Sequence, residues 1–305
     1  MMKCGWFLGV EDVPNHRSSH TEVTPRGGGI GILAALLVCS ILLQIPFFFW
    51  APAFGISLIS LWGGDKYRVP ITIRLLLQLI CGIAFILLFA MRHSDFKDIV
   101  LLSFPMMIFI VGTANFYNFM DGIDGIAGIS GIIGFLLLAY YAHDLPVDVF
   151  LGPLCISIAL ACMGFLIFNF PKAKVFMGDI GSVLIGFLFS IIVLILSDNL
   201  IDFLVMIGFL FPFYFDELFT MAVRIKKKQF LSEAHREHIY QILANKYHMA
   251  HWKISMGYGG IQILIGFSVI TVKSEGIFIL IMLYVFICLL LTSLAFGIRR
   301  KAALQ

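Results

Sequence analysis

Two long apolar runs are separated by the stretch Asn115-Phe116-Tyr117-Asn118-Phe119-Met120-Asp121-Gly122-Ile123-Asp124-Gly125-Ile126-Ala127-Gly128. Amides and carboxylates recur in it at every third position, at Asn115, Asn118, Asp121 and Asp124. Residues three apart share a face of a helix, so we expect these side chains to face the same way. A charged group in a membrane span costs roughly 2.5–3.5 kcal/mol on insertion scales, so it is usually functional or paired. The stripe predicts either a site for a cation or a hydroxyl-rich ligand, or a polar helix cap at the membrane surface.

The composition is that of a polytopic membrane protein. The chain has 305 residues, of which 60% are hydrophobic and 13% are charged, and its mean hydropathy is +1.00. Soluble domains carry about 25% charged residues. We expect one all-α transmembrane domain over residues 1–305, with about ten helices and a long cytoplasmic loop at 224–256. The apolar runs predict spans at 28–45, 47–63, 70–91, 99–117, 124–142, 148–169, 180–197, 200–223, 257–273 and 276–298.

The distribution of basic residues predicts the orientation of these spans. If the loop 11–27 faces the cytoplasm, only Arg92, Lys97 and Lys273 of the 21 Lys and Arg residues fall on the opposite side. Cytoplasmic loops are enriched in Lys and Arg, so we expect both ends of the chain on the inside. The polar clusters then lie at the cytoplasmic face, where nucleotides are available.

A first polar cluster precedes the first predicted span. It reads Asp12-Val13-Pro14-Asn15-His16-Arg17-Ser18-Ser19-His20 and then Thr24-Pro25-Arg26-Gly27-Gly28-Gly29. Glycines before a helix leave backbone N–H groups free to bind an anion, and Arg17, His20 and Arg26 add donors suited to phosphate. The alternative is a basic loop that contacts anionic lipid headgroups.

Two further clusters contain an aspartate beside glycine. The first reads Gly63-Gly64-Asp65-Lys66-Tyr67-Arg68-Val69-Pro70 and is followed by Arg74. Its one carboxylate among three cations is either part of a site or a plain surface ion pair. In the range 169–182, Asp179 lies between two glycines at the start of a span, shortly after Phe176. Asp179 is either a helix N-cap or a ligand of a hard cation such as Mg²⁺. Phe176 is either a core residue or a ring that stacks on a base.

A fourth cluster lies in the long loop and reads Glu233-Ala234-His235-Arg236-Glu237-His238-Ile239-Tyr240-Gln241. We expect His235 and His238 on one face of a helix, with Arg236 beside them. The cluster is either a basic amphipathic helix lying on the membrane or a lid that binds phosphate or sugar. A structural zinc site is disfavoured because it needs more ligands at suitable spacing.

Taken together, the clusters resemble the polyprenyl-phosphate N-acetylhexosamine-1-phosphate transferases, which are of the glycosyltransferase family 4 type and include lipid I synthase and enzymes that initiate O-antigen synthesis. The matching pieces follow in order over nearly the whole chain: Asp12-x-Pro14-Asn15-x-Arg17-Ser18-Ser19-His20 with 24–29, the Gly64-Asp65 turn, Asn118-x-x-Asp121-x-x-Asp124-Gly125, Asn169 with Phe176-Met177-Gly178-Asp179-x-Gly181-Ser182, and the histidine loop. The sequence His235-Arg236-x-His238-x-Tyr240-Gln241 is more similar to the O-antigen-initiating branch. That branch tends to use UDP-linked 6-deoxy-N-acetylhexosamines.

The resemblance implies a reaction and its partners. Undecaprenyl phosphate attacks the β-phosphate of a UDP-N-acetylhexosamine and UMP leaves, while Mg²⁺ (or Mn²⁺) and cationic side chains spread the developing charge. It also implies a multi-pass protein of the bacterial inner membrane, with its site on the cytoplasmic face, that initiates O-antigen, lipopolysaccharide or other cell-wall polysaccharide synthesis. The lipid bilayer is its environment, no nucleic-acid partner is expected, and a homodimer is left open.

The resemblance further implies roles for individual residues. The catalytic residues would be Asp65, Asp121, Asp124 and Asp179, with Asp179 and Asp121 as metal ligands. The substrate-binding residues would be His20, Arg26, Asn118, Asn169, Phe176, His235, Arg236 and His238. Among these, Phe176 would stack on uracil, and His20 and Arg26 would lie near the phosphates.

The chain departs from the family pattern at two places. Gly64 stands where the family usually has an aspartate, and only Met1–Gly9 stands where relatives usually carry one more helix. Either the start codon is misassigned or that span is missing. Two alternatives therefore stay open: an inactive relative that still binds nucleotide sugar or lipid phosphate, and a transporter that uses Asp121, Asp124 and Asp179 as an ion path.

Overall fold

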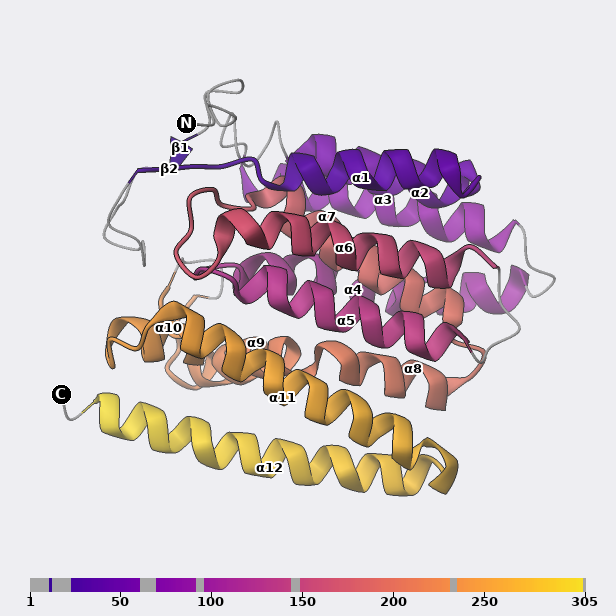
Figure 1. The fold of residues 1–305 in the computed structure, drawn as a ribbon. Helices are drawn as coiled ribbons and strands as arrows, with labels where there is room; N and C mark the ends of the chain where they lie inside the picture. Colours follow the sequence, from indigo (N-terminus) through magenta and orange to yellow (C-terminus); the bar gives the residue numbers. More distant parts are fainter. Residues whose placement is uncertain are drawn as a thin grey trace.

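The long apolar runs of the sequence form helices, because backbone groups in lipid must be hydrogen-bonded within their own segment. The computed structural model describes residues 11–12, 23–60, 70–91, 96–143, 149–230 and 235–303. Its long helices lie side by side along one common direction (Figure 1). The prediction of an all-α polytopic membrane protein is confirmed.

In chain order, the elements are β1 (Glu11–Asp12), β2 (Thr24–Pro25), α1 (Gly29–Leu42), α2 (Phe47–Ser60), α3 (Ile71–Ala90), α4 (Phe96–Met120), α5 (Ile126–His143), α6 (Leu151–Asn169), α7 (Asp179–Leu196), α8 (Leu200–Ile207), the 3₁₀ turn η3 (Gly208–Leu210), α9 (Phe211–Lys226), α10 (Ile239–Asn245), α11 (His251–Val272), the 3₁₀ turn η4 (Lys273–Glu275) and α12 (Ile277–Ala302). The two short strands pair antiparallel.

Eight helical segments in the described part of the chain are long and apolar enough to cross a membrane. They are α3, most of α4, α5, α6, α7, the segment Leu200–Lys226, the segment His251–Glu275 and α12. The α1 and α2 helices have 14 residues each, fewer than the roughly 17–25 residues of a typical span. A helix is present at each of the ten predicted ranges, but the count of about ten spans is not confirmed.

The α7 helix lies at the centre of the bundle. In α7, 89% of the residues are buried inside the bundle, whereas in the most apolar 18-residue part of α12, at the edge, only 11% of the residues are buried. It packs closely on α4 at Gly186, where a Cβ atom would lie 2.7 Å from the Thr113 carbonyl oxygen and 2.8 Å from the Ala114 Cα. Small residues allow helices in membranes to approach this closely.

The span predicted at 200–223 is not one continuous helix. The α8 helix ends at Ile207, and α9 begins at Phe211 after the η3 turn. Pro212 has no N–H group to donate to the carbonyl of Gly208 four residues earlier, so an uninterrupted helix is disfavoured there. Gly208 itself is packed closely, since a Cβ atom on it would lie 2.7 Å from the Tyr284 hydroxyl.

The two ends of the bundle differ in the polar groups they carry. The β1–β2 pair, the loop between α6 and α7, α10 and the C-terminal end of α12 gather at one end (Figure 1). At the opposite end, Asp202 of α8 accepts a hydrogen bond from Tyr141 of α5 at 2.5 Å and pairs with Lys273 at 2.8 Å. These contacts tie three chain segments together at that end. The candidate site lies at the first end.

A substitution at Gly186 tests the close packing of α4 against α7. We expect Gly186→Ala to lower the thermal unfolding midpoint of the detergent-solubilised protein, because overpacking a core typically costs about 1–3 kcal/mol. Gly257→Ala is the matched control, since a Cβ atom there meets nothing within 4 Å. An unchanged midpoint for Gly186→Ala would contradict the tight contact.

Candidate active site

The stripe of amides and carboxylates does not lie on one helix. Asn115 and Asn118 are in α4, but that helix ends before Asp121, and both Asp121 and Asp124 lie in the loop to α5. The expectation of one common helix face is therefore wrong. The loop forms because it is rich in glycine, and Gly125 has a φ of +84°, which other residues rarely adopt.

Asp179 is the centre of a polar cluster at the start of α7. Gly178, with a φ of +73°, takes the N-cap position, so the interpretation of Asp179 as an N-cap is wrong. The Asn118 amide donates to the Asp179 Oδ1 at 3.0 Å and to the Ser182 hydroxyl at 2.8 Å. The Arg74 Nη2 of α3 lies 2.5 Å from the Asp179 Oδ2. The Asp179 and Arg74 side chains remain 18% and 22% exposed, so a ligand can reach both.

Asn169 joins the two loops that carry the aspartates. Its side chain is buried, its Oδ1 accepts from the Gly125 N–H at 2.7 Å, and its Nδ2 donates to the Val175 carbonyl at 2.9 Å. Asn169 therefore fixes the distance between the α4–α5 loop and the α6–α7 loop. Its direct contact with a substrate stays a prediction.

The glycines before α1 bind to protein groups. The N–H groups of Gly28 and Gly29 donate at 2.9 Å to the carbonyls of Phe176 and Met177. The expectation that these N–H groups are free for an anion is therefore wrong. Their contacts instead hold the N-terminal segment against the loop that leads to Asp179.

Arg26 is brought to the same loop, because it pairs with Phe176 in an isolated parallel bridge. Its guanidinium lies 2.8 Å from the Asp12 carboxylate. Phe176 is partly buried. The predicted site residues His20 and Asp65, and the neighbouring Gly64, lie outside the described residues.

Asp124 has a partner that sequence reasoning missed. The His251 Nδ1, in the first turn of α11, lies 3.1 Å from the Asp124 Oδ2. The Ser255 hydroxyl, one turn later, donates to the Asp124 carbonyl at 2.8 Å. The start of α11 thus forms part of the wall around the Asp124 carboxylate. No spacing rule connects residues so far apart, and only the fold shows this pair.

The histidine segment has a different local structure from the one expected. Residues 235–238 are not helical, and α10 begins at Ile239, so the predicted helix that carries both histidines is wrong. The reason is a tertiary contact: the Asp216 carboxylate of α9 accepts from the Ile239 N–H at 2.8 Å and from the Tyr240 N–H at 3.3 Å. Tyr258 of α11 also donates to Asp216, at 2.6 Å. These bonds decide where α10 starts.

The three predicted residues of this segment are placed differently from one another. His238 is only 3% exposed, and its Nε2 lies 3.4 Å from the Glu217 Oε2. The His235 ring packs on the His238 ring with centroids 4.8 Å apart. His235 and Arg236 are partly exposed. The sequence does contain a signal for the two carboxylates that support this segment, Asp216 and Glu217. Adjacent acids inside an apolar span are rare and usually functional or paired.

Tyr240 connects the histidine segment to residues 121–125 between α4 and α5, which we call the aspartate loop. Its hydroxyl donates to the Phe119 carbonyl at 2.9 Å and lies so close to Gly122 that a Cβ there would be 2.1 Å away. Burial first, and then the Asp216 and Asp121 carboxylates, raise the pKa of Tyr240 well above its usual value. Tyr240 therefore stays protonated and keeps this donor at physiological pH.

Burial and charge set the protonation of the histidine segment. Burial, followed by the electrostatic effects of His238 and Arg224, lowers the pKa of His235 to about 4. Burial opposes the ionisation of Glu237, but hydrogen bonds from Lys227 and Gln229 outweigh it and lower its pKa. A neutral imidazole and an ionised carboxylate therefore stand two residues apart near pH 7.

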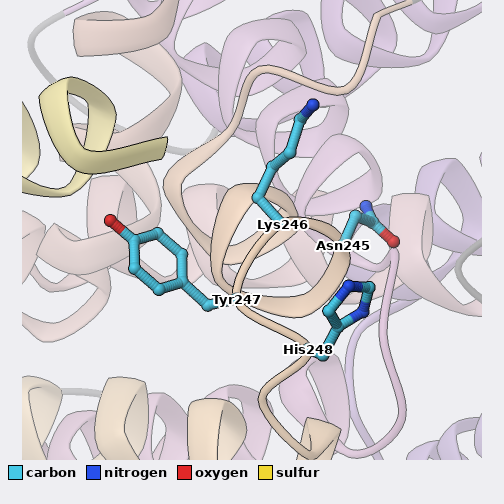
Figure 2. Close-up of a pocket in the computed structure, with 4 residues that line it drawn as sticks. All are labelled: Asn245, Lys246, Tyr247 and His248. Carbon is cyan, nitrogen blue, oxygen red and sulfur yellow. The ribbon is translucent and has the colours of Figure 1, made fainter. Parts of the chain in front are cut away.

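A pocket of about 540 Å³ lies beside the connection from α10 to α11. Figure 2 shows its lining residues Asn245, Lys246, Tyr247 and His248, with Asn245 and His248 on one side and Tyr247 on the other. None of the predicted site residues lines this pocket. We place the site at the Asp179 cluster instead, because the predicted site residues Asn118 and Asp179 meet there and are joined by Arg74 from a third helix.

The fold thus brings together most of the predicted residues that it describes. Asn118 bonds to Asp179, Asn169 bonds to the aspartate loop at Gly125, and Tyr240 brings the histidine segment to that loop. Arg74 also belongs to the cluster, although its sequence context fits a surface ion pair equally well. The described residues contain no group of three or more His, Cys, Asp or Glu side chains arranged to hold a metal ion.

Comparisons with known proteins cover this region. Residues 46–197 match the family model described as Glycosyl transferase family 4. A probable undecaprenyl-phosphate N-acetylglucosaminyl 1-phosphate transferase of Bacillus subtilis is 29% identical over 255 residues, which are 77% of this chain and 70% of the relative. An undecaprenyl-phosphate alpha-N-acetylglucosaminyl 1-phosphate transferase of Thermotoga maritima is 28% identical over 92% of this chain and 86% of its own length. A phospho-N-acetylmuramoyl-pentapeptide-transferase of Staphylococcus epidermidis is 27% identical over 69% and 73% respectively.

The lowered pKa of His235 predicts a pH dependence of stability. Between its ordinary value of 6.5 and about 4, the unfolded chain binds the proton more readily than the folded one. The contribution of the neutral His235 to the free energy of unfolding is therefore fully present above pH 6.5 and is lost as the pH falls toward 4. We expect the thermal midpoint to drop less between pH 7 and pH 5 in His235→Gln than in the wild type. An equal drop would show that His235 is readily protonated in the folded protein.

Proposed function

Because this chain belongs to glycosyl transferase family 4, we propose that it transfers an N-acetylhexosamine 1-phosphate from a UDP-sugar to undecaprenyl phosphate and releases UMP. The names of its relatives support the class of reaction, a sugar-phosphate transfer to a polyprenyl phosphate. The observation that carries the proposal is the convergence of Arg74, Asn118 and Asp179 from three helices. All three lie within the matched range 46–197.

The proposed chemistry is one displacement at phosphorus. A phosphate oxygen of the lipid bonds to the β-phosphorus of the donor, the bond from that phosphorus to the bridging oxygen breaks, and UMP leaves with the electron pair. The second pKa of a phosphomonoester is about 6, so the lipid phosphate is largely ionised near pH 7. The site must therefore hold the anionic lipid phosphate close to the anionic phosphates of the donor. The Arg74 guanidinium is suited to binding such groups.

We propose Mg²⁺, or Mn²⁺ in its place, as the cofactor. The Asp179 carboxylate and the Ser182 hydroxyl offer hard oxygen donors close together, since the Asn118 amide nitrogen bonds to both, and such donors suit Mg²⁺. Mg²⁺ at phosphate substrates usually takes only one or two carboxylates and keeps waters, so the small set of acids here fits it. Bound there, the ion would neutralise charge on the phosphates. Asp121 is the second proposed ligand.

The location and product of the reaction are part of the proposal. The bias of basic residues supports a cytoplasmic site in the bacterial inner membrane, and the Tyr240-Gln241 sequence after the histidines supports a donor of the 6-deoxy-N-acetylhexosamine type. The product would initiate an O-antigen or another cell-surface polysaccharide. Gly64 favours one second candidate, an inactive relative that only binds these ligands.

The first test is UMP release by the purified protein with undecaprenyl phosphate, Mg²⁺ and a panel of UDP-N-acetylhexosamines. We expect lipid-dependent UMP that falls by about two orders of magnitude or more in Asp179→Asn, as when a charge-stabilising group is removed from an active site. Asp198→Asn, exposed at the other end of the bundle, is the matched control and is expected to be active. No UMP from any donor would favour the inactive relative.

The Arg74–Asp179 pair predicts an effect on metal binding. A guanidinium 2.5 Å from the Asp179 carboxylate competes with a divalent cation for that oxygen and repels it. We expect Arg74→Gln to bind Mn²⁺ more tightly than the wild type in the absence of substrate, as measured by paramagnetic resonance. Weaker Mn²⁺ binding in this variant would mean that Asp179 is not the ligand or that Arg74 holds it in place.

A further inference from the structure

The C-terminal helix α12 reaches the histidine segment through one side chain. Most of α12 faces outward, and its buried residues are Leu280, Ile287 and Ala295. At its C-terminal end, however, the Arg299 side chain is only 13% exposed, whereas the next residue, Arg300, is exposed. A single arginine therefore turns inward from a helix that otherwise lies at the edge of the bundle.

The Arg299 guanidinium bonds two separate chain segments. Its Nη2 donates to the Glu237 carbonyl and, at 3.1 Å, to the Thr220 hydroxyl of α9. Its Nη1 lies 3.4 Å from the Glu237 carboxylate. The rigid fork of a guanidinium suits several acceptors at once. Arg299 thus links α12, α9 and the histidine segment.

Neighbouring contacts fix the end of α12 in this place. The Arg299 guanidinium lies over the Phe219 ring at 5.4 Å, and the Phe219 and Phe296 rings meet edge to face at 5.3 Å. The Tyr247 hydroxyl, just beyond α10, donates to the Ile298 carbonyl at 2.8 Å. The position of the guanidinium is therefore set by packing on both sides of the histidine segment.

Glu237 is the residue that receives this link, and it stands between Arg236 and His238. Its carboxylate is bound by Lys227 at 2.8 Å as well as by Arg299. On the inner side, Asp216 accepts hydrogen bonds from the N–H groups of Ile239 and Tyr240. The segment is thus held from inside by α9 and from outside by α12, and little backbone freedom remains at Arg236 and His238.

We propose that Arg299 is a positioning residue, which fixes the histidine segment in the conformation that presents His235 and Arg236 to the donor. The role of the segment in donor binding rests on the function proposed above, whereas the link between α12 and the segment does not. Arg299 acts through Glu237 and does not itself touch the reacting atoms.

The test compares Arg299→Met with Arg300→Met in the full-length protein, since both remove one positive charge at the same end of α12. Hydrogen–deuterium exchange is measured on peptides that cover 235–245. We expect faster exchange there in Arg299→Met, with the exchange of α7 unchanged, and no change in Arg300→Met. Arg299→Lys keeps the charge but not the fork and is expected to be intermediate. Unchanged exchange in Arg299→Met would overturn the proposal.

Kinetics show whether the link serves the site. We expect the KM for the UDP-sugar to rise about tenfold or more in Arg299→Met, the size expected for losing a charged hydrogen bond. The KM for undecaprenyl phosphate is expected to stay the same, and Arg299→Lys to recover part of the loss. Faster exchange with an unchanged donor KM would overturn the positioning role. An equal loss for both substrates would point to general damage and would also count against it.

A variant of Glu237 keeps the proposal testable if Arg299→Met does not fold or if the proposed reaction fails. Glu237→Gln removes the carboxylate that Arg299 binds while leaving α12 intact, so it is expected to raise exchange over 235–245 even if Arg299→Met does not fold. The double variant should add less than the sum of the two single effects, because both remove the contact between the Arg299 guanidinium and the Glu237 carboxylate. If the wild type releases no UMP, the proposed function fails, but the exchange measurements still decide whether Arg299 holds the segment.

Discussion

The hydrogen bond from Asn118 to Asp179 is the contact on which the polar end of the bundle depends. It joins the last turn of α4 to the first turn of α7, and Gly186 lets the two helices pack closely enough for it to form. Arg74 adds α3 to this pair, and Asn169 holds the two loops at a fixed separation. The Arg74 and Asp179 charges, which would be costly if unpaired in the apolar interior, are paired here and stay partly exposed.

A second set of polar contacts closes the site from the side of α9. A buried carboxylate such as Asp216 is tolerated only when donors surround it, and here two backbone N–H groups and the Tyr258 hydroxyl do so. The same bonds set the start of α10 and so the position of Tyr240. The aspartate loop and the histidine segment therefore meet where the Tyr240 hydroxyl of α10 donates to the Phe119 carbonyl of α4.

The sequence alone predicts much of this fold but few of its pairings. The run 180–197 corresponds to Asp179–Leu196, because an apolar segment bounded by polar residues has few other arrangements in lipid. Spacing rules reach only three or four residues, so they could not connect Asp124 to His251, which are 127 residues apart. They also failed at His235 and His238, where a carboxylate from another helix, and not local propensity, decides where α10 begins.

The length and exposure of α12 have a consequence for the surroundings of the site. With 26 residues and a rise of about 1.5 Å per residue, it exceeds the roughly 30 Å hydrocarbon thickness of a typical bilayer. A helix that is longer than the bilayer adjusts its tilt to the local thickness, and only 11% of the most apolar part of α12 is buried against the rest of the bundle. Since Arg299 ties the end of this helix to the histidine segment, we expect the thickness of the surrounding bilayer to influence the position of that segment.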